Sequence, residues 1–265
     1  MKSGLIIYNE ADYQRNVWFV SKCIEEFTKN DISLSYVEEK EVLKYLNNHP
    51  INFVIYRGRD WNLLKRIQEL GIICFNKPYT NHVANDKYLT CSLLRKNDIS
   101  CIESFLSIDD IKQYPCIMKS VDGHGGKEVF LISSKEEAKD ISLKYNKQFI
   151  YQDFYKNNGD VRLYLLNKKV IGAVKRSGGK DFRNNYSLGG EVSSYNPSKE
   201  MEDVAESIAK LIDADFIGVD FLISDDGFSV SEIEDPVGSR MLYKTSDIDI
   251  INLFVSFICK KLLNN

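Results

Sequence analysis

The chain has 265 residues, of which 43% are hydrophobic, and a formal net charge of −3 at neutral pH. This length allows a buried core spread over two or three small lobes, and the near balance of charge predicts no nucleic-acid-binding surface. No apolar run predicts a signal peptide or a membrane span. The six cysteines form no CxxC pair or zinc-ligand spacing, so we expect reduced thiols and a cytoplasmic protein.

The first 80 residues alternate short apolar runs with segments of helical periodicity. Strands are predicted at 5–8, 32–37, 52–56 and 72–75, and helices at 17–27, 41–47 and 61–70. This alternation predicts a parallel sheet with right-handed crossovers. The GxGxxG fingerprint does not follow the first strand, so the sequence does not support a dinucleotide-binding site.

A glycine-rich segment follows a predicted strand at 114–119. Gly123, Gly125 and Gly126 would let backbone amides approach an anion closely, and Lys119 lies just before them. The segment lacks the GxxxxGK[ST] pattern of a Walker A loop. It is therefore a candidate phosphate loop, and an ordinary hairpin turn is the alternative. Helices at 86–96 and 136–145 and a strand at 149–154 are predicted around it.

Two polar segments lie further along the chain. Asp160 and Arg162 share one face of a predicted strand, either as a surface ion pair of little energetic value or facing the same cleft as the glycine loop. The glycine-rich segment 176–190 contains two arginines, Arg176 and Arg183, and two asparagines, Asn184 and Asn185. Arginine forks match phosphate oxygens well, although a mobile surface loop has the same composition.

A hairpin near the C-terminus carries three carboxylates, and the Asp226-Gly227 step predicts its turn. With the turn centred on Asp226, Asp220 lies opposite Glu232, and Glu234 shares their face. Gly218 is expected opposite Glu234, where it leaves open space. Opposed like charges are destabilising unless a cation lies between them, and oxygen ligands suit Mg²⁺ or Mn²⁺. A solvated hairpin with an acidic face is the alternative. After it, residues 248–263 are predicted to form a docked terminal helix.

In their order along the chain, these segments resemble the motifs of the ATP-grasp superfamily, and within it those of the RimK-like ligases, the group of the ribosomal-protein glutamate ligase. The resemblance covers nearly the whole chain. Its most specific parts are 85–87, 181–185 with Gly189-Gly190, and 218–220 with Glu232 and Glu234. It implies an ATP-grasp fold, of class α/β and α+β, with a Rossmann-like pre-ATP-grasp domain at 1–80, a central lobe at 81–151 and a C-terminal lobe at 152–265.

The resemblance also implies roles for individual residues. The ATP contacts would be Lys87, Lys119, Gly123, Gly125, Gly126, Gln152, Asp153, Phe154, Asp160, Arg183, Asn184 and Asn185. The ligands of Mg²⁺ or Mn²⁺, expected as two ions, would be Asp220, Glu232 and Glu234. Arg162 and Arg183 are candidates for stabilising phosphoryl and tetrahedral oxyanions. Arg57 and Arg240 are candidates for pairing with a substrate carboxylate.

The implied reaction is an ATP-dependent ligation. A substrate carboxylate attacks the γ-phosphate to give an acyl phosphate, and an amine then displaces phosphate to form an amide. The substrates would be amino acids, peptides, proteins, carriers or small metabolites, and the family suggests a homo-oligomer. An ATP-binding regulatory protein without ligase activity and a phosphotransferase are the alternatives. One departure from the family is Glu234, which stands where an Asn is usual and is followed by Asp235.

Overall fold

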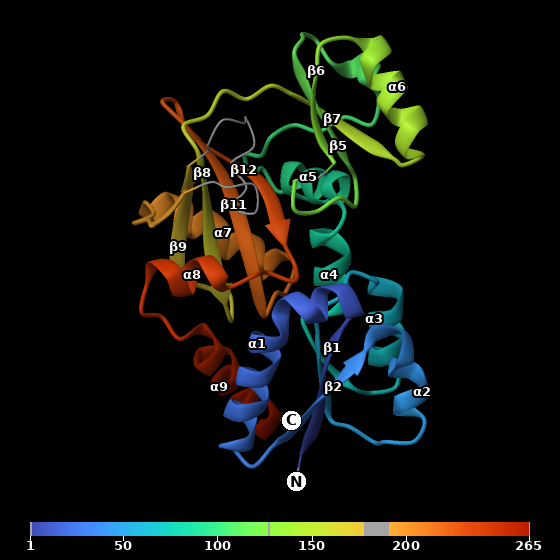
Figure 1. Cartoon of the computed structure of the whole chain (residues 1–265). Helices are drawn as coiled ribbons and strands as arrows, with labels where there is room; N and C mark the ends of the chain where they lie inside the picture. Colours follow the sequence, from blue (N-terminus) through green and yellow to red (C-terminus); the bar gives the residue numbers. More distant parts are fainter. Residues whose placement is uncertain (1, 127, 178–190, 265) are drawn as a thin grey trace.

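The computed structural model describes residues 2–126, 128–177 and 191–264, and these form three β-sheets with flanking helices (Figure 1). The chain completes one sheet before it enters the next, so each lobe is built from a continuous stretch of sequence, except for the last helix. No helix in these ranges is long and apolar enough to cross a membrane.

The N-terminal sheet is parallel, as predicted, with strand order β2-β1-β3-β4. Its strands are β1 (Ser3–Tyr8), β2 (Ser33–Glu38), β3 (Phe53–Tyr56) and β4 (Ile73–Phe75). Its helices are α1 (Glu10–Thr28), the short 3₁₀ helix η1 (Glu39–Glu41), α2 (Val42–Leu46) and α3 (Trp61–Glu69). Helix α1 begins seven residues before the predicted start because the Asn9 side chain caps it by accepting a hydrogen bond from the Asp12 amide.

The central lobe holds a small antiparallel sheet of order β6-β5-β7. Its elements are α4 (Pro78–Ala84), α5 (Lys87–Lys96), η2 (Ile108–Asp110), β5 (Cys116–Ser120), β6 (Val129–Ile132), α6 (Lys135–Tyr145) and β7 (Phe149–Asp153). Lys119 pairs with Val129, so the glycine-rich segment is the connection between β5 and β6. Helix α6 covers one face of this sheet, where Met118, Ile132 and Ala138 are buried together.

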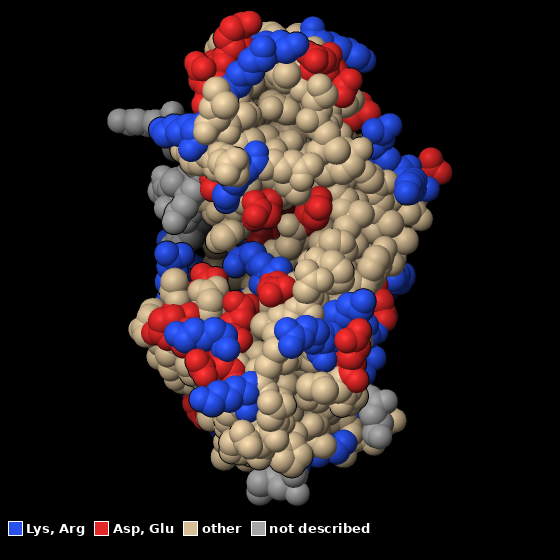
Figure 2. Space-filling view, turned by 90° about the vertical axis from the view of Figure 1, so that its right-hand side faces the viewer, with Lys and Arg blue, Asp and Glu red and all other residues tan. Residues whose placement is uncertain are grey.

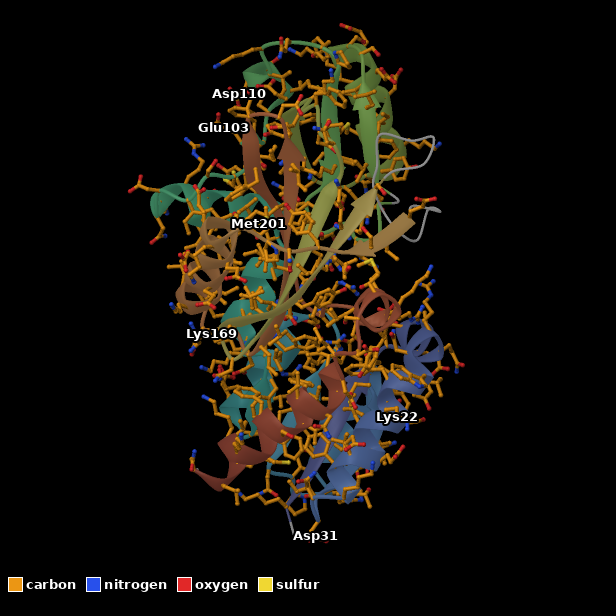
Figure 3. The ribbon with its side chains drawn as sticks, turned by 90° about the vertical axis from the view of Figure 1, so that its left-hand side faces the viewer. Lys22, Asp31, Glu103, Asp110, Lys169 and Met201 are labelled. Atoms are coloured by element: carbon orange, nitrogen blue, oxygen red, sulfur yellow. The ribbon has the colours of Figure 1, made fainter. Side chains whose placement is uncertain are left out.

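The C-terminal sheet is antiparallel, with order β10-β9-β8-β11-β12. Its elements are β8 (Asp160–Leu166), β9 (Lys169–Ser177), β10 (Glu191–Ser194), α7 (Lys199–Leu211), β11 (Phe216–Ser224), β12 (Gly227–Glu234), α8 (Arg240–Thr245) and α9 (Ile250–Leu263). Helix α7 covers one face, and its Met201, labelled in Figure 3, is buried against that face. Because strand side chains alternate, the charged residues of β8 and β11 point to the opposite face.

The last helix, α9, returns to the N-terminal sheet and packs beside α1 (Figure 1). Its apolar stripe is buried as predicted, and Phe254 and Ile258 share one core with Phe19 and Phe27 of α1. The two chain ends therefore lie close together at the same end of the molecule. This packing joins the first and last elements of the chain in one hydrophobic core.

Candidate active site

A pocket lies between the central sheet and the C-terminal sheet. In Figure 2 a hollow bordered by acidic and basic side chains is visible between the upper and lower parts of the molecule. The pocket is lined by the predicted site residues Lys87, Lys119, Gly123, Gly125, Gly126, Gln152, Asp153, Phe154, Asp160, Asp220, Glu232 and Glu234. Predicted residues that are far apart in sequence thus surround one cavity. Arg183, Asn184 and Asn185 lie outside the described residues.

The register of the β11–β12 hairpin is the one predicted, since Asp220 lies opposite Glu232 and Gly218 opposite Glu234. The turn itself differs, because Ser224 pairs with Gly227 around a two-residue loop. That turn alone would place Asp220 opposite Ser231. A β-bulge next to Asp220 shifts the pairing by one residue and turns both glutamates toward the pocket.

Three carboxylates of this hairpin form one cluster. Asp220, Glu232 and Glu234 each offer an oxygen, and these oxygens lie within 4.8 Å of one another. Asp220 is buried and the two glutamates are half-buried. The cluster therefore has the composition and spacing of a site for a hard divalent cation.

Arg162 lies beneath the cluster, directly across from Asp220 on the neighbouring strand β8. Its Nε and Nη2 donate to the two oxygens of Asp220, both at 2.7 Å, and Nη2 also donates to Glu234 Oε1 at 2.8 Å. The space expected at Gly218 is not open: a Cβ there would lie 3.2 Å from Arg162 Cδ and 2.8 Å from Val237 Cγ2. Glycine at this position lets the arginine reach the carboxylates.

Arg176, which the sequence analysis noted only as one of two arginines in the glycine-rich segment, forms ion pairs beside the pocket. It lies across from Asp160 on strand β9, and donates to that carboxylate at 2.7 and 2.5 Å and to Asp220 at 2.6 Å. The interpretation of Asp160 and Arg162 as a surface ion pair is wrong, because both are buried and their partners are on other strands. Predicting Arg176 as a partner of Asp160 would have required the pairing of β8 with β9, which places the two residues opposite each other.

Burial and ion pairing set the charge of the two aspartates. Burial tends to raise the pKa of Asp220, but Arg162 and Arg176 outweigh it and hold this pKa at about 2. At Asp160 burial prevails over the attraction of Arg176, and the pKa is raised to about 6. Asp220 is therefore a carboxylate throughout the physiological range, while Asp160 titrates near its lower end.

Two lysines converge on Glu232. Lys87 Nζ and Lys119 Nζ each lie 3.7 Å from Glu232 Oε1, and Lys87 also donates to the carbonyl of Gly123. Burial tends to raise the pKa of Glu232, but the two lysines outweigh it and the pKa lies below its ordinary value. Burial lowers the pKa of Lys119. These two lysines place positive charge where the glycine-rich connection meets the carboxylate cluster.

The opposite end of the pocket is less charged. Its apolar lining, which the sequence analysis did not single out, consists of Ile102, Ile117, Val129 and Leu222. The Gln152 side chain is turned into the core, where Nε2 donates to Ser104 Oγ at 2.7 Å. Asp153 Oδ1 is buried and has no hydrogen-bond partner within the described part of the chain. The apolar lining forms a slot, and apolar walls beside a few polar groups are typical of a small-molecule site.

The two predicted substrate arginines do not line this pocket in the part of the chain that is described. Arg57 is buried: it donates to the Val237 carbonyl at 2.6 Å and to the Tyr8 hydroxyl at 3.1 Å. Arg240 donates to the carbonyl of Arg15. Arg57 therefore holds the segment after β12 against the N-terminal sheet.

A smaller pocket adjoins the carboxylate cluster on the side of the N-terminal domain. It shares Lys87, Gly123, His124, Glu232 and Glu234 with the larger pocket. The rest of its described lining is Arg59, Ala84, Asn85, Asp122, Ile233 and Asp235. Two of the three clustered carboxylates, Glu232 and Glu234, thus line both cavities.

The end of strand β12 is anchored by the segment that carries α4. Asp235 is buried, and its oxygens accept hydrogen bonds from Asn76 and Asn81, both at 2.9 Å. Asn85 Nδ2 donates to the Asp235 carbonyl at 2.7 Å. Burial raises the pKa of Asp235 even though the two amides stabilise its charged form. This network fixes the backbone next to Glu234.

Two antiparallel sheets that enclose a pocket, a glycine-rich connection with lysines, and a carboxylate cluster on the floor define the ATP-grasp class of enzymes. Residues 84–258 match the RimK-like ATP-grasp domain, so the chain belongs to the RimK-like ATP-grasp family. The predicted family and fold are thereby confirmed. The protein is an ATP-grasp ligase that forms carbon–nitrogen bonds.

Individual proteins are similar to the chain. It is 28% identical over 268 residues to the uncharacterized protein MG011 of Mycoplasma genitalium, covering 98% of this chain and 93% of that one. It is 28% identical over 211 residues to the probable alpha-L-glutamate ligase of Haemophilus influenzae, covering 74% and 70%. The D-alanine–D-alanine ligase of Bacillus anthracis, solved with ATP, superposes with a TM-score of 0.78 at 14% identity, covering 100% and 98%, and shows the shared fold.

Proposed function

We propose that this ligase joins an amino acid or other amine to a carboxylate substrate that lies in the smaller pocket, with ATP in the larger one. The observation that carries the proposal is that Glu232 and Glu234 of the carboxylate cluster line both pockets and so mark their junction. Lys87 and Lys119 lie at the same junction and would meet the triphosphate there. The apolar slot and Asp153 at the far end would receive the adenine.

The described residues fit one or two Mg²⁺ ions, which we propose as the resident metal. The donors are hard carboxylate oxygens, which Mg²⁺ prefers, and Mg²⁺ usually adds substrate phosphates to one or two protein carboxylates. Asp220 and Glu234 accept hydrogen bonds from Arg162, whereas the lysines at 3.7 Å from Glu232 are too far for direct hydrogen bonds. Glu232 is thus the most available ligand. When bound, Mg²⁺ would neutralise phosphate oxygens and orient them for transfer.

The roles of the protein side chains follow from their partners. Arg162 and Arg176 hold Asp220 from two sides, so we propose that they keep the metal ligands charged and oriented. This role replaces the contact of Arg162 with the reacting oxyanions that the sequence suggested. Lys119 would neutralise the negative charge of the γ-phosphoryl group while this group is transferred to the carboxylate and then released as phosphate.

Two cationic side chains lie in the described lining of the smaller pocket, and Arg59 is the one that the N-terminal domain supplies. We propose that Arg59 binds a carboxylate of the substrate. Its Nη1 donates to Asp12 at 3.2 Å, which leaves other N–H groups of the guanidinium for a ligand. His124 lines the same cavity and offers a further hydrogen bond. Because one relative is named as a glutamate ligase, L-glutamate is the first amine substrate to test.

A substrate panel tests the proposed function. The protein with Mg–ATP is incubated with each of the amino acids together with small carboxylic acids and peptides, and ADP release and product mass are measured. Ligation requires ADP release that depends on both a carboxylate and an amine, with an amide as product. A phosphorylated product without an amide would establish a phosphotransferase, and nucleotide binding without turnover would establish a regulatory protein.

We also propose a cytoplasmic location, which the presence of all six cysteines as thiols supports. A homo-oligomer is proposed from the family alone. Light scattering of the purified chain at several concentrations would measure its mass, and a mass of 30.5 kDa at every concentration would contradict the oligomer.

A further inference from the structure

Two cysteines lie against each other beside the nucleotide pocket. Cys91 is on α5, and Cys101 lies on the segment that follows this helix and bridges to Val230 of β12. Their Sγ atoms are 3.6 Å apart. A disulfide requires about 2.05 Å between the sulfur atoms, so the two sulfurs would have to approach each other by about 1.5 Å to form one.

Solvent reaches this pair from one side. Cys91 is buried, whereas Cys101 is half-buried and lines a shallow surface groove with Arg95, Ser100 and Glu103. Glu103, labelled in Figure 3, lies at the molecular surface. A small oxidant can therefore approach Cys101 through the groove, while Cys91 stands behind it as the second sulfur.

The pair also has thiolate character. The hydrogen bond between the two sulfur atoms lowers the pKa of the Cys91 thiol to about 6, against the opposing effect of burial, and Ser104 and Arg95 further stabilise the thiolate. The same hydrogen bond raises the pKa of Cys101. A thiolate next to a second thiol, with access to solvent, is the environment in which cysteines oxidise reversibly.

Both cysteines lie within a few residues, along the chain, of residues that line the nucleotide pocket. Cys91 follows Lys87 by one turn of α5, and Lys87 lies at the carboxylate cluster. Cys101 precedes Ile102, which lines the nucleotide pocket and whose amide donates to the Val230 carbonyl at 2.9 Å. A bond between the two sulfurs would pull together two segments that border the same pocket.

We propose that Cys91 and Cys101 form a reversible regulatory disulfide that weakens nucleotide binding. The Cys101 proton passes along the hydrogen bond to the Cys91 thiolate, the accessible Cys101 sulfur attacks a peroxide, the O–O bond breaks, and a sulfenic acid and hydroxide form. The other sulfur then attacks the sulfenic sulfur, the S–S bond forms, the S–O bond breaks, and water leaves with the thiol proton. A small thiol reverses the reaction by exchange.

The coupling to nucleotide rests on the proposed function, whereas disulfide formation does not. Oxidation should weaken binding of Mg–AMPPNP at least about five-fold, the lower end of couplings between linked sites. Because coupling is reciprocal, saturating Mg–AMPPNP should lower the equilibrium constant for disulfide formation by the same factor.

The test treats the full chain with hydrogen peroxide and, separately, with a glutathione redox buffer. Thiols are counted by alkylation and intact mass, the linked peptides are identified by mapping, and Mg–AMPPNP binding is titrated by calorimetry before and after reduction. We expect the loss of two thiols, a linkage of residue 91 to residue 101, weaker binding, and recovery with dithiothreitol. Cys91→Ser and Cys101→Ser should abolish all of these, and Cys259→Ser, at another half-buried cysteine, should leave them intact.

Each other outcome is informative. Two alkylatable thiols at these positions after oxidation would overturn the proposal, and a disulfide without weaker binding would overturn its regulatory part. If the reduced protein does not bind Mg–AMPPNP at all, the proposed function fails, while the linkage is still scored by mass. If Cys91→Ser does not fold, the half-buried Cys101→Ser carries the comparison.

Discussion

At the scale of single residues, the site depends on which cation meets which carboxylate. Asp220 is held by two arginines and Glu232 is approached by two lysines. The arginines make short hydrogen bonds that orient their partner, whereas the lysines lie farther away and can move to a phosphate. The cluster therefore combines Asp220, whose carboxylate is held rigidly, with Glu232, whose carboxylate is more available to a ligand.

Replacing the available ligand should affect metal binding more than folding. Glu232→Gln keeps the shape of the side chain and removes the charge, so the affinity for Mg²⁺ should fall at least about 10- to 100-fold, by comparison with losses from metal-site neighbours. A Mg²⁺ titration of AMPPNP binding measures this. Asp226→Asn in the exposed turn of the same hairpin is the matched control, and an equal effect in both variants would contradict the role of Glu232.

Arg59 is the residue whose replacement separates substrate binding from nucleotide binding. Arg59→Ala removes charge-assisted hydrogen bonds worth about 1.5–3 kcal/mol, so KM for the carboxylate-bearing substrate should rise more than about ten-fold. KM for ATP should not change, because Arg59 does not line the described wall of the larger pocket. Steady-state ADP release measures both constants. Arg66→Ala, at an exposed arginine of α3, should change neither.

At the scale of elements, strand pairing brings the charges together. Asp160 and Asp220 line the pocket, Arg162 lies opposite Asp220 because β8 and β11 pair antiparallel, and the β-bulge turns Glu232 to the same face. The period of two and the Asp-Gly turn allowed the sequence to predict the hairpin and its three carboxylates. The bulge was not predictable, because it depends on how the whole strand packs against its neighbours.

A substitution at Gly218 tests the packing around the hairpin. In Gly218→Ala the new Cβ would meet Val237 and Arg162 at 2.8 and 3.2 Å, so overpacking should lower the free energy of unfolding by about 1–3 kcal/mol. It should also weaken Mg–AMPPNP binding, because Arg162 must shift. Urea unfolding and calorimetry measure the two effects. Gly238→Ala is the control, since a Cβ there meets nothing within 4 Å; a neutral Gly218→Ala would show that Arg162 is not held by this contact.

At the scale of the whole molecule, the first and last elements share one core. Helix α9 packs on α1, and Phe254 lies against Phe216 of the C-terminal sheet with ring centroids 5.1 Å apart. Arg57 and the Asp235 network join the N-terminal domain to the segment that follows the carboxylate cluster. The relative positions of the domains, and hence the smaller pocket, depend on these contacts.

Phe254→Ala should therefore lower the stability of the whole protein. Removing a fully buried phenylalanine should lower the free energy of unfolding by about 3–5 kcal/mol. Leu253→Ala, one residue earlier and 42% exposed, should change it by less than about 0.5 kcal/mol. Urea denaturation compares them, and similar midpoints for the two variants would mean that α9 does not contribute to the shared core.

The sequence by itself determined the parallel N-terminal sheet, the glycine-rich connection, the carboxylate hairpin and the docking face of α9, since these depend on periodicity and turn residues within short stretches. Tertiary structure decided the partners of the charges. Arg176 reaches Asp160 and Asp220 only when three strands pair, and Arg57 is buried while Arg59, two residues later, lines a pocket. Such choices depend on contacts between segments far apart in the chain, which no local pattern specifies.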